Sequence, residues 1–275
     1  MPEAQIIDPL LLDGATAPDR HHVLVGGGEL LAYCAPTPDA DTENQDAAAV
    51  IPYGPQAAVF VVADGAGGLP AGRLASQTAV RALIAELESA SEKTIILRTS
   101  ILDGIEAANA AVLGLGNGSA TTFTVITIEG LTARAYQVGD SEAIIVGQRG
   151  IIRLQTLSHS PTGHAVEAGF LDQREALHHH ERHLVSNFLG SANMRIDMGA
   201  EIGLRPRDTV ILASDGLLDN VHTAEIIERA RKGPLLKAAD AIIALARRRM
   251  NGTAVEQPSK PDDLSLILFR KPGRP

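Results

Sequence analysis

Apolar runs separated by short turns divide the middle of the chain into closely spaced strands. Residues 121–128 and 132–138 form two such runs, and Glu129-Gly130 between them is a two-residue turn signal. Two further runs follow at 142–146 and 151–154 after similarly short connections. Strands joined by tight turns are antiparallel, because a parallel pair needs a long crossover. The pattern therefore predicts an antiparallel meander.

Helical periodicity lies on both sides of this meander. Residues 76–87 and 99–113 place apolar side chains at helical spacing, after a short apolar strand at 57–63. Further strands are predicted at 209–213 and 264–269, and further helices at 172–180, 223–231 and 234–250. Thr223 is the predicted N-cap of the helix over 223–231. Helices before and after a strand meander indicate an α+β fold rather than a doubly wound sheet.

The remaining segments suggest how the domain is organised. Residues 1–30 are predicted to form an N-terminal tail or an edge strand. Residues 156–190 are polar, His-rich and irregular, and are predicted to form a surface excursion near the site. No internal repeat and no composition shift marks a linker, so residues 1–275 are predicted to form a single domain.

Composition limits which cellular compartments and which classes of partner are compatible with the chain. The formal net charge is −9 and there is no long basic run, which argues against nucleic acid or an anionic membrane as a partner. The single Cys34 cannot form an internal disulfide, so a reducing compartment is favoured and a buried structural role is preferred to a catalytic one. No leader-like segment and no apolar stretch of about 20 residues is present. The sequence therefore predicts a cytoplasmic protein.

Four aspartate motifs each stand at the end of a predicted strand, centred on Asp64, Asp140, Asp215 and Asp262. Taken singly, each is as consistent with an ordinary turn or cap. Carboxylates gathered in one place repel each other unless cations neutralise them. Oxygen ligands of this kind suit Mg²⁺ or Mn²⁺. Together the motifs predict a metal-dependent hydrolase.

The segment after Asp64 is rich in glycine, at positions 65, 67 and 68. Glycine allows a sharp backbone turn and lets a carbonyl oxygen face a ligand. A metal ion could then bind the Asp64 carboxylate and the Gly65 carbonyl oxygen together. The helix that follows would also direct N–H groups toward a phosphate. Asp46, beside an apolar run at 47–50, is a further candidate acid.

These motifs occur in one order between residues 44 and 269: Asn44-Gln45-Asp46, the glycine motif after Asp64, 118–122, 138–141, 157–160, 189–190, 204–219 and 262–265. The set resembles the metal-dependent protein phosphatases of type 2C, in a bacterial form. The resemblance implies a four-layer α-β-β-α sandwich, in which helices flank two central antiparallel sheets. It also implies a protein Ser/Thr phosphatase that hydrolyses phosphomonoesters through a metal-bridging hydroxide, with no covalent phosphoenzyme.

By this resemblance, Asp64 bridges two Mn²⁺ or Mg²⁺ ions, and the Gly65 carbonyl binds one of them. Asp215 and Asp262 complete the ligands of the pair, which makes Asp64, Asp215 and Asp262 the catalytic set. Asp263 stands where the family often has Asn, so the ligand of the last motif is either Asp262 or this neighbour.

Two further acids take supporting roles by the same resemblance. Asp46 orients metal-bound waters from behind the ligands, and Asp140 is the ligand of a third, weaker metal. The implied partner is a phosphoprotein substrate, such as one marked by a Ser/Thr kinase.

The chain departs from the family at two positions. Asp41 stands where many members carry a phosphate-binding arginine, and the sequence alone cannot place Arg20 or Arg73 as a replacement. Ala66 stands where eukaryotic members often have a histidine as general acid, which leaves protonation of the leaving group to a metal-bound water. Two alternatives stay open: a catalytically weak phosphoprotein-binding or sensor module of the same fold, and a hydrolase of small phosphomonoesters.

The histidine-rich segment at residues 178–183 could suggest a metal site. His179 and His183 are four residues apart and could share one helix face, but the segment lacks the glutamate position of a zinc-protease helix. A polar surface is the favoured interpretation, with phosphate recognition or a pH-sensitive role as the alternative. His159 is predicted to make a structural hydrogen bond.

Overall fold

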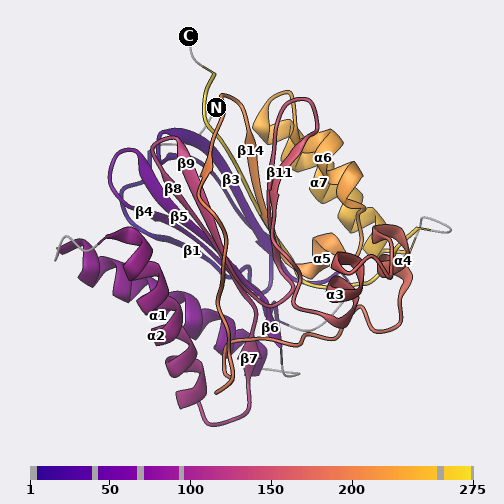
Figure 1. Ribbon diagram of the computed structural model, residues 1–275, viewed down its shortest axis with the longest axis horizontal. Helices are drawn as coiled ribbons and strands as arrows, with labels where there is room; N and C mark the ends of the chain where they lie inside the picture. Colours follow the sequence, from indigo (N-terminus) through magenta and orange to yellow (C-terminus); the bar gives the residue numbers. More distant parts are fainter. Residues whose placement is uncertain (1–4, 39–42, 67–70, 93–95, 253–256, 274–275) are drawn as a thin grey trace.

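Two large antiparallel sheets face each other in the computed structural model, which describes residues 5–38, 43–66, 71–92, 96–252 and 257–273 (Figure 1). The first sheet has the order β1 (Leu10–Leu12), β4 (Ala47–Pro52), β5 (Ala57–Ala63), β8 (Phe123–Glu129), β9 (Thr132–Val138) and β12 (Asp197–Met198), and β13 (Ile202–Gly203) also pairs with β9. The second has the order β11 (Ile152–Gln155), β10 (Glu142–Val146), β14 (Thr209–Ala213), β15 (Leu264–Arg270), β3 (Gly28–Ala35) and β2 (Asp19–Val25).

The core lies on both faces of each sheet, which explains why central strands such as β4 and β5 are apolar along almost their whole length. In β5, Phe60 and Val62 pack between the two sheets, whereas Val59 and Val61 pack against helices on the outside. The rings of Phe60 and Phe269 join the two sheets, with their centroids 5.1 Å apart. Because the residues of such central strands meet an apolar layer on both faces, continuous Val, Ile, Leu and Ala runs replace polar–apolar alternation there.

Helices cover the outer face of each sheet (Figure 1). The first sheet is covered by α1 (Ala71–Glu92) and α2 (Leu97–Gly114), and the second by α5 (Asp215–Leu218), α6 (Thr223–Ala230) and α7 (Leu235–Met250). The order of layers is therefore helix, sheet, sheet, helix. The predicted four-layer α-β-β-α sandwich is confirmed.

Element boundaries agree with the sequence pattern where a strand is bounded by turns. The strands predicted at 132–138, 142–146 and 209–213 coincide with β9, β10 and β14. The prediction of Thr223 as an N-cap is wrong, because His222 occupies the cap position without a side-chain bond and Thr223 is already helical. Burial of Ile226 and Ile227, and not a capping hydroxyl, holds α6 in place.

The excursion between β11 and β12 contains α3 (Pro161–Glu167) and α4 (Gln173–His178). A capping box starts α4, in which the Asp172 side chain accepts from two backbone amides and Glu175 bonds back. Because α4 ends at His178, the suggestion that His179 and His183 share one helix face is wrong. The rings of His179 and His180 stack on each other instead, at 4.5 Å.

The segment before residue 30 contains β1, β2 and the start of β3. β1 lies beside β4 at one edge of the first sheet, and β2 forms the edge of the second sheet in a hairpin with β3. Among the described residues, no helix combines the length and the apolar character needed to cross a bilayer.

Candidate functional site

Acidic residues from distant parts of the chain meet where strands of both sheets end. Asp64 follows β5 of the first sheet, whereas Asp215 follows β14 and Asp262 precedes β15 of the second. Burial raises the pKa of Asp64 well above its usual value, and the next causes are the carboxylates of Asp215, Asp46, Asp262 and Asp140. These side chains therefore lie close enough to act on one another electrostatically.

The backbone around Asp64 is fixed by close packing. Residues Gly65–Ala66 form β6, which pairs with β7 (Ala120–Thr121). A Cβ atom on Gly65 would collide with the carbonyl oxygens of Gly72 and Gln45. The Asp64 amide donates to Thr122 Oγ1 at 2.9 Å, and the Thr122 amide donates to the Asp64 carbonyl at 2.8 Å. The Asp64 carboxylate is thus presented from a rigid support, and only glycine fits beside it.

Glycine also brings Asp215 against the start of β15. A Cβ atom on Gly216 would collide with the carbonyl oxygen of Asp263. The first turn of α5 therefore lies directly on the segment that carries Asp262. In this way one small residue joins two acids that are 47 positions apart in the chain.

Asp262 and Asp263 have different surroundings. Asp263 accepts from the backbone amide of Thr37 at 2.8 Å and from that of Gln45 at 2.7 Å, one on each carboxylate oxygen. The carboxylate of Asp262 accepts from the neighbouring Asp263 amide at 3.0 Å, and its other oxygen faces Lys260. Asp263 anchors the chain, so the geometry favours Asp262 as the ligand of this motif.

Asp46 lies behind these acids and is almost fully buried. Its Oδ2 accepts from the Ser214 hydroxyl at 2.8 Å, and the Ser214 Oγ in turn accepts from the Ser265 amide at 3.0 Å. Burial, followed by the charge of Asp263, raises the pKa of Asp46 well above its usual value. This hydrogen-bonded chain ties Asp46 to the segments that precede Asp215 and follow Asp262.

A lysine lies among the acids. The Lys260 Nζ is 2.9 Å from Asp262 Oδ2 and 3.1 Å from Asp219 Oδ2, and it also donates to Asp215 Oδ2. Within the described residues, no group of three or more Asp, Glu, His or Cys side chains has the arrangement of a preformed metal cluster. The carboxylates of Asp215, Asp219 and Asp262 instead point toward the ammonium.

Asp140 provides a direct test of whether the site suits a cation. Its Oδ1 is buried and has no hydrogen-bond partner in the part of the chain that the structure describes. Burial, followed by the charge of Asp215, raises the pKa of Asp140 well above its usual value. An unpaired buried carboxylate oxygen is costly. A divalent ion, which prefers oxygen ligands, would satisfy it, so the residues fit such an ion.

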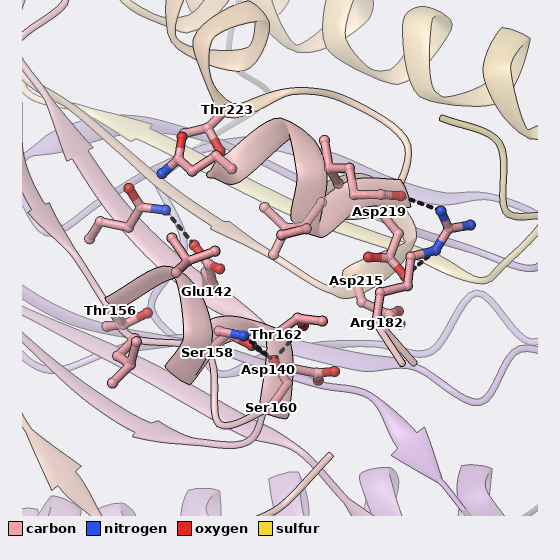
Figure 2. Close-up of a pocket in the computed structure, with 18 of the residues that line it drawn as sticks. Asp140, Glu142, Thr156, Ser158, Ser160, Thr162, Arg182, Asp215, Asp219 and Thr223 are labelled. Atoms are coloured by element: carbon pink, nitrogen blue, oxygen red, sulfur yellow. Dashed lines mark hydrogen bonds and ion pairs between the residues drawn. The ribbon is translucent and has the colours of Figure 1, made fainter. Parts of the chain in front are cut away.

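A cavity of about 350 Å³ opens next to this acidic centre (Figure 2). Asp140, Glu142, Asp215 and Asp219 line its inner side. The excursion also lines the cavity, with Arg182 beside Asp215 and Asp219, and with Ser158, Ser160 and Thr162 near Asp140 (Figure 2). The guanidinium of Arg182 faces Asp219, with Nε 3.8 Å from Oδ2 (Figure 2). The cavity lining thus combines acidic residues with hydroxyls and a cation.

Comparison with known proteins identifies the family of the chain. A family model described as protein phosphatase 2C matches residues 39–249, which is most of the chain. The chain belongs to the protein phosphatase 2C family. The predictions of this family and of a protein phosphatase are confirmed.

Among individual protein phosphatases of this family, the Ser/Thr phosphatase stp of Listeria innocua is 27% identical over 216 residues, which are 74% of this chain and 84% of that protein. Protein phosphatase PhpP of Streptococcus pneumoniae is 29% identical over 175 residues, or 61% of this chain and 70% of that protein. The solved Ser/Thr phosphatase of S. agalactiae superposes with a TM-score of 0.73 at 26% identity, covering 88% of this chain and 99% of that one.

Sequence reasoning about this protein phosphatase 2C missed three charged residues of the centre: Asp219, Lys260 and Arg182. Asp219 lies one helical turn after Asp215 in the same motif, which could have revealed it. Lys260 stands two positions before Asp262, a weaker signal. Arg182 lies in the histidine-rich segment at residues 178–183, for which phosphate recognition was the alternative role, but only the path of the excursion brings it to Asp219.

Arg20 and Arg73 are the two residues that could replace the family's phosphate-binding arginine, and the structure shows the partners of both. Asp41, which stands at the position of that arginine, lies outside the described residues. Arg20 pairs with Asp240 of α7 at 2.5 Å. Arg73, at the start of α1, pairs with Glu43 at 2.5 Å and with Asp13 at 3.5 Å. Both guanidinium groups are already neutralised by other acids.

The predicted structural roles of Cys34 and His159 are confirmed. The buried Cys34 thiol accepts from Asn44 Nδ2 at 3.0 Å, and burial raises its pKa strongly. His159 Nδ1 accepts from the Gly139 amide at 3.1 Å, and Nε2 lies 3.0 Å from Asp197. His159 therefore supports the loop that carries Asp140.

Proposed function

We propose that the acidic centre hydrolyses phosphoserine and phosphothreonine in proteins, using Mn²⁺ or Mg²⁺. The observation that carries this proposal is the meeting of Asp64, Asp140, Asp215 and Asp262 at one end of the sandwich, with a buried Asp140 oxygen left unpaired among the described residues. Family membership supports it. The whole chain would act as a single phosphatase domain.

In this proposal, Asp64, Asp215, Asp262 and the Gly65 carbonyl hold two ions, and Asp140 holds a third, weaker one. Asp46 orients water from behind, through the position that Ser214 gives it. Bound divalent ions supply charge neutralisation for the phosphate and a water of lowered pKa.

The chain's own groups would position the substrate. The hydroxyls on the excursion side of the cavity can donate hydrogen bonds to a phosphorylated segment. Arg182 places a cation in the cavity lining, and a phosphate dianion would compete with Asp219 for it. The substrate would be a phosphoprotein, such as one made by a Ser/Thr kinase, and the single buried Cys34 supports the cytoplasm as its location.

Two other functions compete with this proposal. A weak phosphoprotein sensor would not need an unpaired carboxylate oxygen inside a cluster of raised pKa values, so the site argues against it. A hydrolase of small phosphomonoesters would use an enclosing pocket with polar anchors, and the relative kcat/KM for a phosphopeptide and p-nitrophenyl phosphate separates it from a protein phosphatase.

A substrate and metal assay tests the proposal. Chelator-treated protein should turn over neither a phosphothreonine peptide nor p-nitrophenyl phosphate, and Mn²⁺ should restore both activities. The kcat/KM for the peptide should exceed that for p-nitrophenyl phosphate, because only the peptide offers groups beyond the phosphate that the cavity lining could bind in the transition state. Absence of turnover by protein shown to have bound Mn²⁺ would instead favour the sensor function.

The acids of the centre also predict how stability depends on pH. Burial raises the pKa of Asp262 to about 7, of Glu142 to about 7 and of Asp219 to about 6, with Asp215 adding to the shifts of Asp262 and Asp219. The folded chain therefore binds protons more tightly than the unfolded chain. The resulting stability is present near pH 4 and is lost as pH rises toward about 7.

We expect the melting temperature of chelator-treated protein to fall between about pH 5 and pH 7. Saturating Mn²⁺ should raise it more at pH 7 than at pH 5, because protons and metal compete for the same oxygens. Thermal scans at several pH values, with EDTA and with Mn²⁺, measure both trends. A metal-induced rise that shrinks with increasing pH would contradict the assignment of these acids.

A further inference from the structure

Lys260 occupies the position that a cation would take in the acidic centre. Its ammonium lies within ion-pair distance of Asp215, Asp219 and Asp262. The Lys260 side chain is 24% exposed, and those of Asp215 and Asp219 are 14% and 12% exposed. The Asp262 side chain is 33% exposed. An ammonium placed among these three carboxylates, two of them largely buried, neutralises part of their mutual repulsion.

The backbone of Lys260 is held in place by a buried side chain. The Lys260 amide donates to Asn220 Oδ1 at 2.8 Å, and Asn220 Nδ2 donates to the Lys260 carbonyl at 2.8 Å. Asn220 is fully buried and also donates to the Gly216 carbonyl at 2.9 Å. Asn220 follows α5, the helix that carries Asp215, so the lysine and two of its acids are fixed to one another.

The preceding residues are held as well. The Ser259 hydroxyl donates to the Arg249 carbonyl at 2.7 Å, and Arg249 Nη1 donates to the Asn220 carbonyl at 2.8 Å. The ammonium thus starts from a fixed point, although its four-carbon stem can rotate away. This combination allows a cation that is always nearby and can still be displaced.

Two cations cannot use the same carboxylate oxygens without repelling each other. Lys260 contacts Asp215 Oδ2 and Asp262 Oδ2, which belong to two of the acids assigned to the divalent ions. We propose that Lys260 competes with the divalent metal for these carboxylates and so sets the metal affinity of the centre. This inference rests on the proposed function, because it takes the centre to be a metal site.

Two consequences follow from this competition. When metal is removed, the lysine keeps the acids together, so its loss should destabilise the protein in the presence of chelator. When metal is added, the lysine must leave, so its loss should tighten metal binding. Loss of a surface lysine with no part in the centre would produce neither effect. Loss of a lysine that holds the metal ligands in place would weaken metal binding instead of tightening it.

The test compares Lys260→Met, which keeps the aliphatic stem, with Lys260→Arg, which keeps the charge. Lys237→Met, an exposed lysine of α7, is the matched control. Calorimetric titration of chelator-treated, dialysed protein with MnCl₂ gives the dissociation constant. Thermal scans in EDTA give the stability without metal.

For Lys260→Met we expect the Mn²⁺ dissociation constant to fall about tenfold or more, the size of one partly buried ion pair. Its melting temperature in EDTA should fall by several degrees. Lys260→Arg should melt in EDTA close to the parent, and Lys237→Met should match the parent in both measurements. Together these results would support the competition.

A Mn²⁺ dissociation constant in Lys260→Met that stays within about twofold of the parent, or rises, overturns the inference. If the parent binds Mn²⁺ and needs it for turnover, the proposed function survives that result. If neither the parent nor Lys260→Met binds Mn²⁺, both the inference and the proposed function fail.

Discussion

Replacing Asp64 by asparagine is expected to lower kcat/KM for a phosphopeptide by about 10³-fold or more. Asp64 is the acid proposed to bridge the two ions, and asparagine keeps its shape while removing the charge. The same change should leave the melting temperature in EDTA equal or higher. The reason is that burial and four neighbouring acids disfavour the charged form of Asp64 in the folded protein. Activity would therefore be lost while the fold is kept.

The matched control for this variant is Asp103→Asn, which removes an exposed acid of α2 and should change neither activity nor stability. Steady-state kinetics with saturating Mn²⁺ and thermal scans in EDTA separate the two effects. An Asp64→Asn protein that keeps more than about a tenth of the parent kcat/KM would remove Asp64 from the reaction. One that unfolds would show a structural role instead.

The antiparallel meander and the α+β class could be predicted because their signals are local and agree with each other, whereas the four-layer sandwich was implied only by the family resemblance. Turn residues bound β9 and β10, and the connection between these two strands is too short for the crossover that a parallel pair needs. Where local residue preferences gave a wrong element boundary, the burial of apolar side chains explains the observed one. α6 begins without the threonine cap because Ile226 and Ile227 hold it against the second sheet. The charged residues of β2 left a tail or an edge strand open for residues 1–30, and the apolar run of β3, which pairs with β2, was not predicted as a strand.

The candidate site was predictable only in part, for a related reason. Asp64 and Asp215 are each followed by a glycine that the close backbone packing requires, so the Asp-Gly pairs could be recognised in the sequence. The roles of Asp262 and Asp263 could not be separated from the sequence, because they depend on amides more than 200 positions away. Lys260 is positioned by Asn220, and that contact likewise has no sequence signature.

Asp262 and Asp263 should respond to substitution in opposite ways. Asp262→Asn should lower kcat/KM by about 10²-fold or more, because it removes a ligand charge while its Oδ1 can still accept from the Asp263 amide. Asp263→Ala should cost about 3 kcal/mol of unfolding free energy. It strands the amides of Thr37 and Gln45, which now donate to a carboxylate.

Urea unfolding in EDTA measures the stability difference, and Mn²⁺ titration of the remaining folded protein measures ligand loss. Asp263→Asn is the informative intermediate, since its single carbonyl oxygen can keep one of the two amide bonds and should recover part of the stability. A reversed pattern, in which Asp263→Asn loses Mn²⁺ binding and Asp262→Asn keeps it, would assign the ligand to Asp263. In that case the two backbone amides would orient a metal ligand instead of anchoring the start of β15.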